Sequence, residues 1–214
     1  MEIAGYLTTA LVAYLIGSIP TGFLVAQAKG IDIRSVGSGN IGATNVFRML
    51  GKPAGIFVLF VDGLKGFAAC AWIADLLIKS FAIPAGDQEY LRIIAGFGVV
   101  LGHNYTCWLH FKGGKGIATS AGVLSALVPW ALLIILAIWI IVFALSRYVS
   151  LGSIAASSAL PFATWITGGS LTLIIVTGAM SALAIYKHKE NIRRLLNGTE
   201  NRLGSKKMNE EAAK

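Results

Sequence analysis

Charged side chains are scarce in this sequence: they make up 13% of its 214 residues, whereas a typical soluble domain has about 25%. Hydrophobic residues make up 56%, and the mean hydropathy is +0.72. A deficit of this size excludes an ordinary soluble domain. It predicts an integral membrane protein with several spans.

Acidic residues are scarcer than basic ones, with 10 against 18, so the net charge is +8. The Lys and Arg residues lie in short stretches between apolar runs, as is typical of loops on the cytoplasmic side of a membrane. That placement argues against nucleic-acid binding, which is the other common explanation for a net positive charge. The only two cysteines, Cys70 and Cys107, lack the spacing of a metal site or redox motif, so we expect free thiols.

Patterns for metal binding and covalent catalysis are also missing. The polar loops contain few carboxylates and neither an HxxxH nor a paired-Asp arrangement, so we expect no metal and no other cofactor. The HxxxxD acyltransferase pattern fails, because Trp108 follows His103 by five residues and Arg193 follows His188 by five. No GxSxG turn occurs, so a covalent serine intermediate lacks support.

The apolar runs predict an all-α integral membrane protein with about seven transmembrane helices, some of them short or broken. The predicted spans are residues 3–28, 55–81, 90–109, 117–128, 130–145, 151–166 and 171–186. Residues Gly17, Pro20 and Gly22 predict a kink near the end of the first run, which we interpret as a retained span rather than a signal peptide. Asp62 and Lys65 lie three apart in the second run and can pair on one helical face.

Pro129 divides the apolar run 117–145 into two crossings. With this break, Lys29, Arg147 and Lys187 all fall on the cytoplasmic side, which places the N-terminus outside and the C-terminus inside. Five full crossings remain an alternative if two short segments are re-entrant. We expect residues 1–202 to form a single domain and residues 203–214 to form a polar, disordered tail.

Four polar segments share the cytoplasmic side in this topology: residues 37–48, 102–119, 147–153 and 186–200. Their cations include Arg48, Lys112, Lys115, Arg147, Arg193 and Arg194. Their hydroxyl and amide side chains include Ser38, Asn40, Thr44, Asn45, Ser150, Ser153 and Asn191. Cations beside glycine-rich backbone and hydrogen-bonding groups are typical of sites for phosphate-bearing ligands. His103 and His188 are the candidate proton carriers.

Three of these stretches resemble the motifs of the bacterial acyl-phosphate:glycerol-3-phosphate acyltransferase family, the PlsY family. Residues 37–48 (GSGNIGATNVFR) look like its first motif, residues 102–119 (GHNYTCWLHFKGGKGIAT) its second, and residues 188–200 (HKENIRRLLNGTE) its third. Their order and spacing agree, and the resemblance extends nearly to Arg202. Three motifs of this length are far more specific than a single glycine pattern.

The resemblance implies transfer of an acyl group from acyl phosphate to the 1-hydroxyl of sn-glycerol 3-phosphate, with lysophosphatidic acid and phosphate as products. This reaction is the first acylation step of bacterial phospholipid synthesis, without metal or acyl-CoA. The expected location is the bacterial cytoplasmic (inner) membrane, with the active site facing the cytoplasm. The expected partners are the two substrates and the bilayer, with no obligatory protein partner and no nucleic acid.

Carried over by motif position, the catalytic residues implied are Ser38, Lys115, His188 and Asn191. The substrate-binding residues implied are Asn40, Asn45, Arg48, His103, Lys112, Gly113, Gly114 and Ser153. Arg48 and Lys115 would hold phosphate in one anion-binding groove. Direct transfer is preferred, and the proton of the attacking hydroxyl goes either to His188 or to the acyl phosphate; the lack of an acid–base dyad favours the substrate.

The rival hypothesis is a transporter or flippase for a phosphorylated solute or lipid, since transporters also use broken helices and basic pockets. Against it, the polar segments lie on one face rather than at the midplane, and no inverted repeat is visible. A non-catalytic lipid-binding membrane subunit is a third alternative, which the density of polar motifs disfavours.

Overall fold

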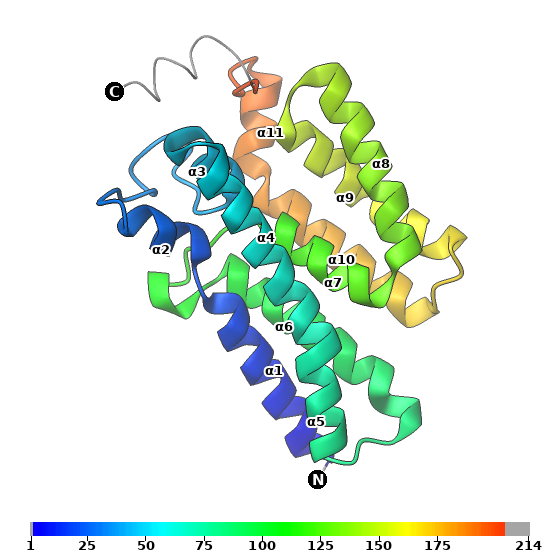
Figure 1. Ribbon diagram of the computed structural model, residues 1–214. Helices are drawn as coiled ribbons and strands as arrows, with labels where there is room; N and C mark the ends of the chain where they lie inside the picture. Colours follow the sequence, from blue (N-terminus) through cyan, green and yellow to red (C-terminus); the bar gives the residue numbers. More distant parts are fainter. Residues whose placement is uncertain (1, 204–214) are drawn as a thin grey trace. The chain divides into compact units, whose positions relative to one another are not determined.

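The computed structural model describes residues 2–203, which contain helices and loops and no strand (Figure 1). The α-helices are α1 (Glu2–Ser18), α2 (Thr21–Gln27), α3 (Ala43–Leu50), α4 (Lys52–Ala68), α5 (Ala74–Ser80), α6 (Gln88–Asn104), α7 (Ile117–Leu127), α8 (Pro129–Ser146), α9 (Val149–Ile166), α10 (Leu171–Lys187) and α11 (Lys189–Leu196). A π-helix, η1 (Ala69–Ile73), joins α4 to α5, and two 3-10 turns, η2 (Ala85–Asp87) and η3 (Cys107–Leu109), precede and follow α6. The predicted all-α class is confirmed. Residues 204–214 of the predicted tail lie outside the described residues.

Four helical segments are long and apolar enough to cross a membrane: Glu2–Gln27, Lys52–Ser80, Pro129–Ser146 and Val149–Ile166. A fifth is added if Leu171–Lys187 and Lys189–Leu196, bent by 56°, count as one span. Helix α6 has 17 residues, and α7 has 11, which gives α7 a length of about 17 Å at 1.5 Å per residue. Each predicted run contains a helix, but the number of full crossings and the orientation of the termini stay predictions.

Proline breaks the helices at the two positions where the sequence predicted a break. Helix α1 ends at Ser18, and α2 begins at Thr21, directly after Pro20. Helix α8 begins at Pro129, two residues after α7 ends at Leu127. Pro129 is the first residue of α8, where its missing N–H needs no partner, and Pro20 directly precedes the first residue of α2. Each proline therefore lies where a new helix starts.

The chain divides into two compact units, with the boundary between Leu127 and Val128. Unit 1 precedes this boundary, and unit 2 follows it. A single domain over residues 1–202 stays a prediction.

Unit 1 packs α1 on α6, and α4 on both α7 and α3. Glycines let these helices approach closely: an added Cβ on Gly17 would collide with the Val99 carbonyl, and one on Gly66 with the Thr119 carbonyl. This is the packing role that small residues have between membrane helices. In unit 2, α9 packs between α8 and α10, and Ser181 of α10 donates a hydrogen bond to the Ser157 carbonyl of α9 at 2.5 Å.

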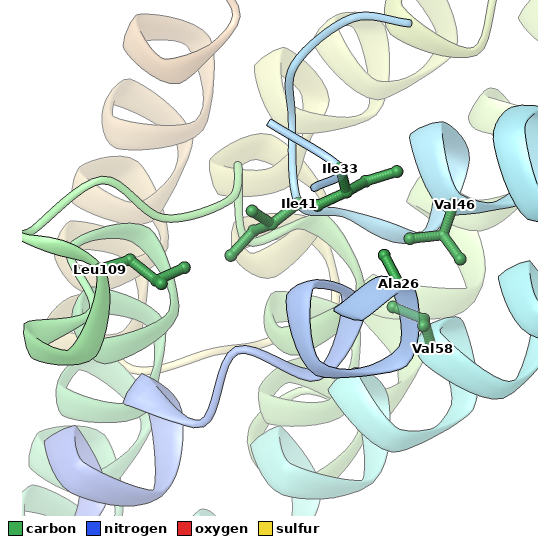
Figure 2. Close-up of a cluster of buried hydrophobic side chains, with 6 residues drawn as sticks. All are labelled: Ala26, Ile33, Ile41, Val46, Val58 and Leu109. Carbon is green, nitrogen blue, oxygen red and sulfur yellow. The ribbon is translucent and has the colours of Figure 1, made fainter. Parts of the chain in front are cut away.

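A buried apolar cluster in unit 1 joins its two polar segments (Figure 2). The cluster consists of Ala26, Ile33, Ile41, Val46, Val58 and Leu109. Ile41 and Val46 belong to the polar segment 37–48, and Leu109 belongs to η3, just before the glycine–lysine stretch 112–116. Both segments are therefore anchored on one core rather than free in solvent.

Candidate functional site

Asn45 organises the loop that carries Ser38. The Asn45 side chain is 1% exposed, and its Oδ1 accepts a hydrogen bond from the Ser38 N–H at 2.9 Å. Its Nδ2 donates to the carbonyls of Ile33 at 3.2 Å and Val36 at 3.1 Å. Asn45 thus ties both ends of a loop to the first turn of α3, and the Ser38 side chain is exposed above it. Its amide is used inside the protein, which makes Asn45 a support for Ser38.

Asn40 ends the same loop. Its Oδ1 accepts from the Gly42 N–H at 2.9 Å, in the turn that leads into α3. Such a local side-chain bond competes with helix and favours a turn before the helix start. Arg48 follows in the last turn of α3, four residues after Thr44, so it lies on the same face of the helix.

The loop before Ser38 is held by an exposed ion pair. The Arg34 guanidinium binds both carboxylate oxygens of Asp32, at 2.9 and 2.8 Å. Hydrogen bonds from the Arg34 side chain and backbone lower the pKa of Asp32 to about 2. The pair is solvent-exposed, so it orders the loop without adding much stability.

The glycine–lysine stretch 112–116 folds back onto the end of α6. After η3, the chain reverses through His110 and Phe111, both in the left-handed region at φ 53° and 60°. The Gly113 N–H then donates to the Asn104 carbonyl at 3.2 Å, and the Gly114 N–H donates to the His103 carbonyl at 3.0 Å. These bonds satisfy carbonyls that a helix C-terminus leaves without intrahelical partners.

The glycines are required by close approach. An added Cβ on Gly113 would collide with the His103 carbonyl oxygen, and one on Gly114 would collide with the His103 ring. The sequence predicted that Gly113 and Gly114 contact substrate, and their N–H groups were the obvious donors. In this structure both N–H groups already donate to α6, so the cations of the loop remain as the groups that can attract phosphate. Lys112 is exposed, and Lys115 is half-buried.

His103 lies beneath this loop rather than at its surface. Its side chain is 6% exposed, and its Nδ1 lies 3.6 Å from Asp62 Oδ1. The predicted pair of Asp62 and Lys65 is confirmed, with the Lys65 Nζ 2.8 Å from the same Asp62 oxygen. His103 is therefore connected both to the loop and to a buried ion pair.

In unit 2, one carboxylate connects the two polar segments. Glu200 Oε1 accepts from Ser150 Oγ at 2.8 Å and from Asn191 Nδ2 at 2.8 Å. Glu200 Oε2 accepts from Arg194 Nε at 2.7 Å. Ser150 lies in the first turn of α9, whereas Asn191 and Arg194 lie on α11, so Glu200 joins these two helices.

The environment of Glu200 favours its charged form. Burial by itself raises the pKa of the carboxyl group, but the hydrogen bonds from Asn191, Arg194 and Ser150, with the Arg194 charge, hold that pKa below its usual value. Glu200 lies in the predicted polar segment 186–200, but its motif position implied no role for it. A single carboxylate after two arginines and an Asn-Gly turn was the available signal.

Ser153 and His188 are both buried in unit 2. Ser153 Oγ donates to the Val149 carbonyl at 3.0 Å and accepts from Trp139 Nε1 at 3.3 Å. His188 lies at the junction of α10 and α11, and its Nδ1 lies 2.8 Å from the Ala184 carbonyl oxygen. Because a carbonyl can only accept, Nδ1 carries the proton, and Nε2 is the atom of the neutral ring that can take a proton.

The predicted site residues therefore form two groups. Unit 1 brings together the segments that carry Ser38, Asn40, Asn45, Arg48, His103, Lys112, Gly113, Gly114 and Lys115 on one core. In unit 2, Ser150 and Asn191 share Glu200, Ser153 lies three residues after Ser150 on α9, and His188 lies three residues before Asn191 at the start of α11. Within residues 2–203, no group of three or more His, Cys, Asp or Glu side chains could hold a metal ion.

Known proteins resemble this chain over nearly its whole length. The sequence profile of the family described as Glycerol-3-phosphate acyltransferase matches residues 7–198. A relative from Endomicrobium trichonymphae, named glycerol-3-phosphate acyltransferase, is 47% identical and aligns over 90% of this chain and 93% of its own. Another of that name, from Aquifex aeolicus, is 44% identical and aligns over 89% of this chain and 95% of its own.

Two crystal structures of PlsY, described as an integral membrane glycerol 3-phosphate acyltransferase, have the same fold as this chain. The glycerol 3-phosphate form has a TM-score of 0.83 and 43% identity, and the match covers 93% of this chain and 96% of that chain. The lysophosphatidic acid form has a TM-score of 0.81 and 41% identity, with coverage of 95% and 97%.

Proposed function

Because the chain belongs to the glycerol-3-phosphate acyltransferase family of integral membrane enzymes, we propose that it moves an acyl group from acyl phosphate to the 1-hydroxyl of sn-glycerol 3-phosphate. The products are lysophosphatidic acid and inorganic phosphate. The reaction is an acyl transfer to an alcohol, with phosphate as the leaving group.

The observation that carries the proposal is the likeness to PlsY in two forms, one with glycerol 3-phosphate and one with lysophosphatidic acid. One is the acceptor and the other is the product of the proposed reaction. The acyl phosphate donor is supported by the chemistry of the loops, which supply cations and hydrogen-bond donors for phosphate. An acyl phosphate is already an activated anhydride, so the protein needs to position it, neutralise its charge and move one proton.

The residues of unit 1 bind phosphate in this proposal. Arg48 offers a planar guanidinium, which suits bidentate contacts with phosphate oxygens, and Lys115 offers an ammonium charge. Ser38 contributes its exposed hydroxyl, which Asn45 holds in place by fixing the backbone N–H of Ser38. Lys112, at the exposed end of the loop, adds positive charge that attracts the anionic substrates.

The residues of unit 2 orient the reacting groups. Asn191 donates its second Nδ2 hydrogen to a substrate oxygen, and Glu200 positions that amide through the 2.8 Å bond to its Nδ2. Ser153 donates to a substrate oxygen by turning its hydroxyl away from the Val149 carbonyl. The proton of the attacking hydroxyl goes to a phosphate oxygen of the donor as the phosphate leaves. His188 Nε2 is the alternative acceptor, because its Nδ1 is engaged with the Ala184 carbonyl.

The pH profile of a His188→Gln variant separates these two routes. If the donor phosphate accepts the proton, turnover falls modestly, and the pH profile keeps its shape. If His188 is the general base, kcat falls by a factor of about 10²–10⁴ and loses its dependence on a group that titrates near neutral pH. The second result would reject the substrate-assisted route.

We also propose seven crossings in the bacterial cytoplasmic membrane, with the N-terminus outside and all four polar segments on the cytoplasmic side. The helices α1 with α2, α4 with α5, α6, α7, α8, α9 and α10 supply these crossings. Single-cysteine labelling in intact cells tests the arrangement. A cysteine at Asp87 should react with an impermeant maleimide, and one at Lys112 should react only after lysis; the reverse pattern would reject it.

Product formation tests the function itself. Purified protein in detergent, given acyl phosphate and labelled glycerol 3-phosphate, should produce labelled lysophosphatidic acid. The transporter hypothesis predicts instead that proteoliposomes accumulate the labelled solute with no chemical change. Uptake without lysophosphatidic acid would reject the proposed enzyme.

A further inference from the structure

Unit 1 contains a buried ion pair that the proposed chemistry does not use. Asp62 and Lys65 face each other one turn apart on α4, within the apolar segment Lys52–Ser80. The Lys65 Nζ lies 2.8 Å from Asp62 Oδ1, and the side chains are 7% and 2% exposed. Ionisable residues inside a membrane span are costly, so their presence indicates a functional role.

One part of that role concerns the break in the first span. Asp62 Oδ1 accepts from the Thr21 hydroxyl at 3.0 Å, and Lys65 Nζ donates to the Ile19 carbonyl at 2.9 Å. Ile19 and Thr21 flank Pro20, where α1 ends and α2 begins. Backbone groups freed by a helix break inside a membrane protein need such partners. If the pair had only a structural role, these contacts with Ile19 and Thr21 would be sufficient to explain it.

The pair also reaches the glycine–lysine loop through His103. The Asp62 oxygen that accepts from Thr21 lies 3.6 Å from His103 Nδ1, in the last turn of α6. The His103 ring fills the space beside Gly114, since a Cβ on Gly114 would collide with it at Nε2. The His103 carbonyl accepts the Gly114 N–H at 3.0 Å. His103 therefore contacts the loop through both its ring and its backbone.

We infer that Asp62 is a positioning residue, which orients the His103 ring so that it supports Gly114 and thereby sets the place of Lys115 in the phosphate-binding loop. The inference rests on the proposed function, because it takes glycerol 3-phosphate as the ligand of that loop. A carboxylate that faces one ring nitrogen fixes the tautomer and the orientation of an imidazole, as it does behind metal-bound histidines. In neutral His103, Nδ1 then carries the proton toward Asp62, and Nε2 faces the loop.

The tautomer of His103 is directly measurable, because the chain has only three histidines. Histidine-selective ¹⁵N labelling in detergent, with His103→Gln for assignment, gives the shifts of both ring nitrogens. We expect a protonated Nδ1 in the wild-type protein at a pH where the ring is neutral. A neutral His103 with its proton on Nε2 would overturn the inference without any variant of the ion pair.

Replacement of the pair tests the effect on binding. Asp62→Leu with Lys65→Met removes both charges together and leaves no unpaired buried ion. We expect the KM for glycerol 3-phosphate to rise roughly tenfold or more, while the KM for acyl phosphate changes far less. Asp62→Asn with Lys65→Met keeps an oxygen acceptor for His103 and should restore part of the lost affinity. This rescue is not expected if the pair only fills space.

Asp75→Leu with Arg92→Met is the matched control. It removes a more exposed ion pair, in which Asp75 of the same segment lies 2.8 Å from Arg92 of α6, eleven residues before His103. Its KM for glycerol 3-phosphate should stay within about twofold of wild type. Thermal unfolding of each variant separates binding from folding. Equal KM increases in both double variants, or losses that only follow the unfolding midpoint, would overturn the inference.

Ligand titration separates this inference from the proposed function. Glycerol 3-phosphate, added without donor, should shift the His103 ring signals in wild-type protein and should do so far less after Asp62→Leu with Lys65→Met. If His103 responds and no lysophosphatidic acid forms from acyl phosphate, the positioning role stands, and the proposed reaction fails. If lysophosphatidic acid forms and His103 does not respond to glycerol 3-phosphate, the positioning role fails alone.

Discussion

The two units hold their polar segments by different means. In unit 1, the glycine–lysine loop is closed by backbone bonds from Gly113 and Gly114 to the end of α6, with no room for a Cβ at either residue. In unit 2, the segments are joined by side chains, all of which donate to the single carboxylate of Glu200. The arrangement in unit 1 depends on the small size of Gly113 and Gly114, and the arrangement in unit 2 depends on the negative charge of Glu200.

This difference has a consequence for what each unit tolerates. A backbone loop is insensitive to pH, but a single added methyl group forces it to move. A carboxylate that accepts three donors tolerates changes of volume around it, but loss of its charge turns one oxygen into a donor and leaves at least one of the three donors without an acceptor. Size changes should therefore act most strongly in unit 1, and charge changes in unit 2.

The largest effect is expected for Glu200→Gln, which removes the charge and turns one oxygen into a donor. The remaining amide oxygen cannot accept from Arg194 and also from the buried Ser150 and Asn191, so at least one donor loses its acceptor, at about 1–3 kcal/mol for each unsatisfied group. Arg194 is a third exposed, so water compensates part of its loss. We expect the unfolding midpoint to fall by roughly 6–12 °C, from about 3 kcal/mol at 2–4 °C per kcal/mol, with loss of acyltransferase activity.

Glu190→Gln is the control for this variant, because Glu190 is an exposed carboxylate on the same helix α11. Its unfolding midpoint should stay near the wild-type value. If the two variants unfold at the same temperature, the charge of Glu200 does not hold unit 2 together.

The pH dependence of unfolding should show the same carboxylate. The pKa of Glu200 is lower in the folded protein than its ordinary value of 4.5, so the unfolded chain binds the proton more readily. The contribution of ionised Glu200 to folding stability is complete above about pH 4.5 and is lost as the pH falls through the pKa that Glu200 has in the folded protein. Between pH 6 and pH 3, the free energy of unfolding should fall less in Glu200→Gln than in the wild-type protein. Equal pH dependence in the two proteins would contradict the pKa shift.

Gly114→Ala tests whether the glycine–lysine loop of unit 1 depends on small residues. Its effect on stability should be smaller than that of Glu200→Gln. The added methyl group pushes against the His103 ring and displaces the loop, which costs about 1–3 kcal/mol. We expect the KM for glycerol 3-phosphate to rise roughly tenfold, measured as initial rates at saturating acyl phosphate. Gly86→Ala, in open space in η2, is the matched control and should leave KM unchanged. If Gly114→Ala and Gly86→Ala have the same KM, close packing of Gly114 against His103 does not position the loop.

The smallest effects are expected in the Ser38 loop. Asn45→Ala removes three hydrogen bonds, each worth about 0.5–1.5 kcal/mol, whereas Asn40→Ala removes the single bond to the Gly42 N–H. We expect Asn45→Ala to lower kcat/KM about tenfold and Asn40→Ala to lower it by a factor of about two to three. The reverse order would show that Asn40 serves substrate rather than the loop.

Composition and proline placement predicted most of the fold. The apolar runs located the helices, and Pro20 and Pro129 located the breaks, because these signals act locally along the chain. The short α7 and the π-helix at Ala69–Ile73 could not be predicted, because packing against other helices decides them.

The sequence identified many residues of the candidate site, but it did not predict what each of them does. The motifs named Asn45 and His103 as substrate-binding residues, whereas in the structure Asn45 supports Ser38 and His103 lies beneath the glycine–lysine loop. The pairing of Asp62 with Lys65 followed from their spacing. The role of Glu200 and the contact of Asp62 with His103 depend on residues far apart in sequence meeting in space. Spacing along the chain carries no information on such contacts. Likewise, the use of the Gly113 and Gly114 N–H groups by α6 became visible only in three dimensions.

Donor choice is the most direct test of the central claim. Purified protein in detergent with a chelator is given labelled glycerol 3-phosphate and either acyl phosphate or acyl-CoA of the same chain length, and lysophosphatidic acid and released phosphate are measured together. We predict one phosphate for each lysophosphatidic acid formed from acyl phosphate, unchanged by the chelator, and no product from acyl-CoA. Product from acyl-CoA alone, or activity that the chelator abolishes, would contradict the account.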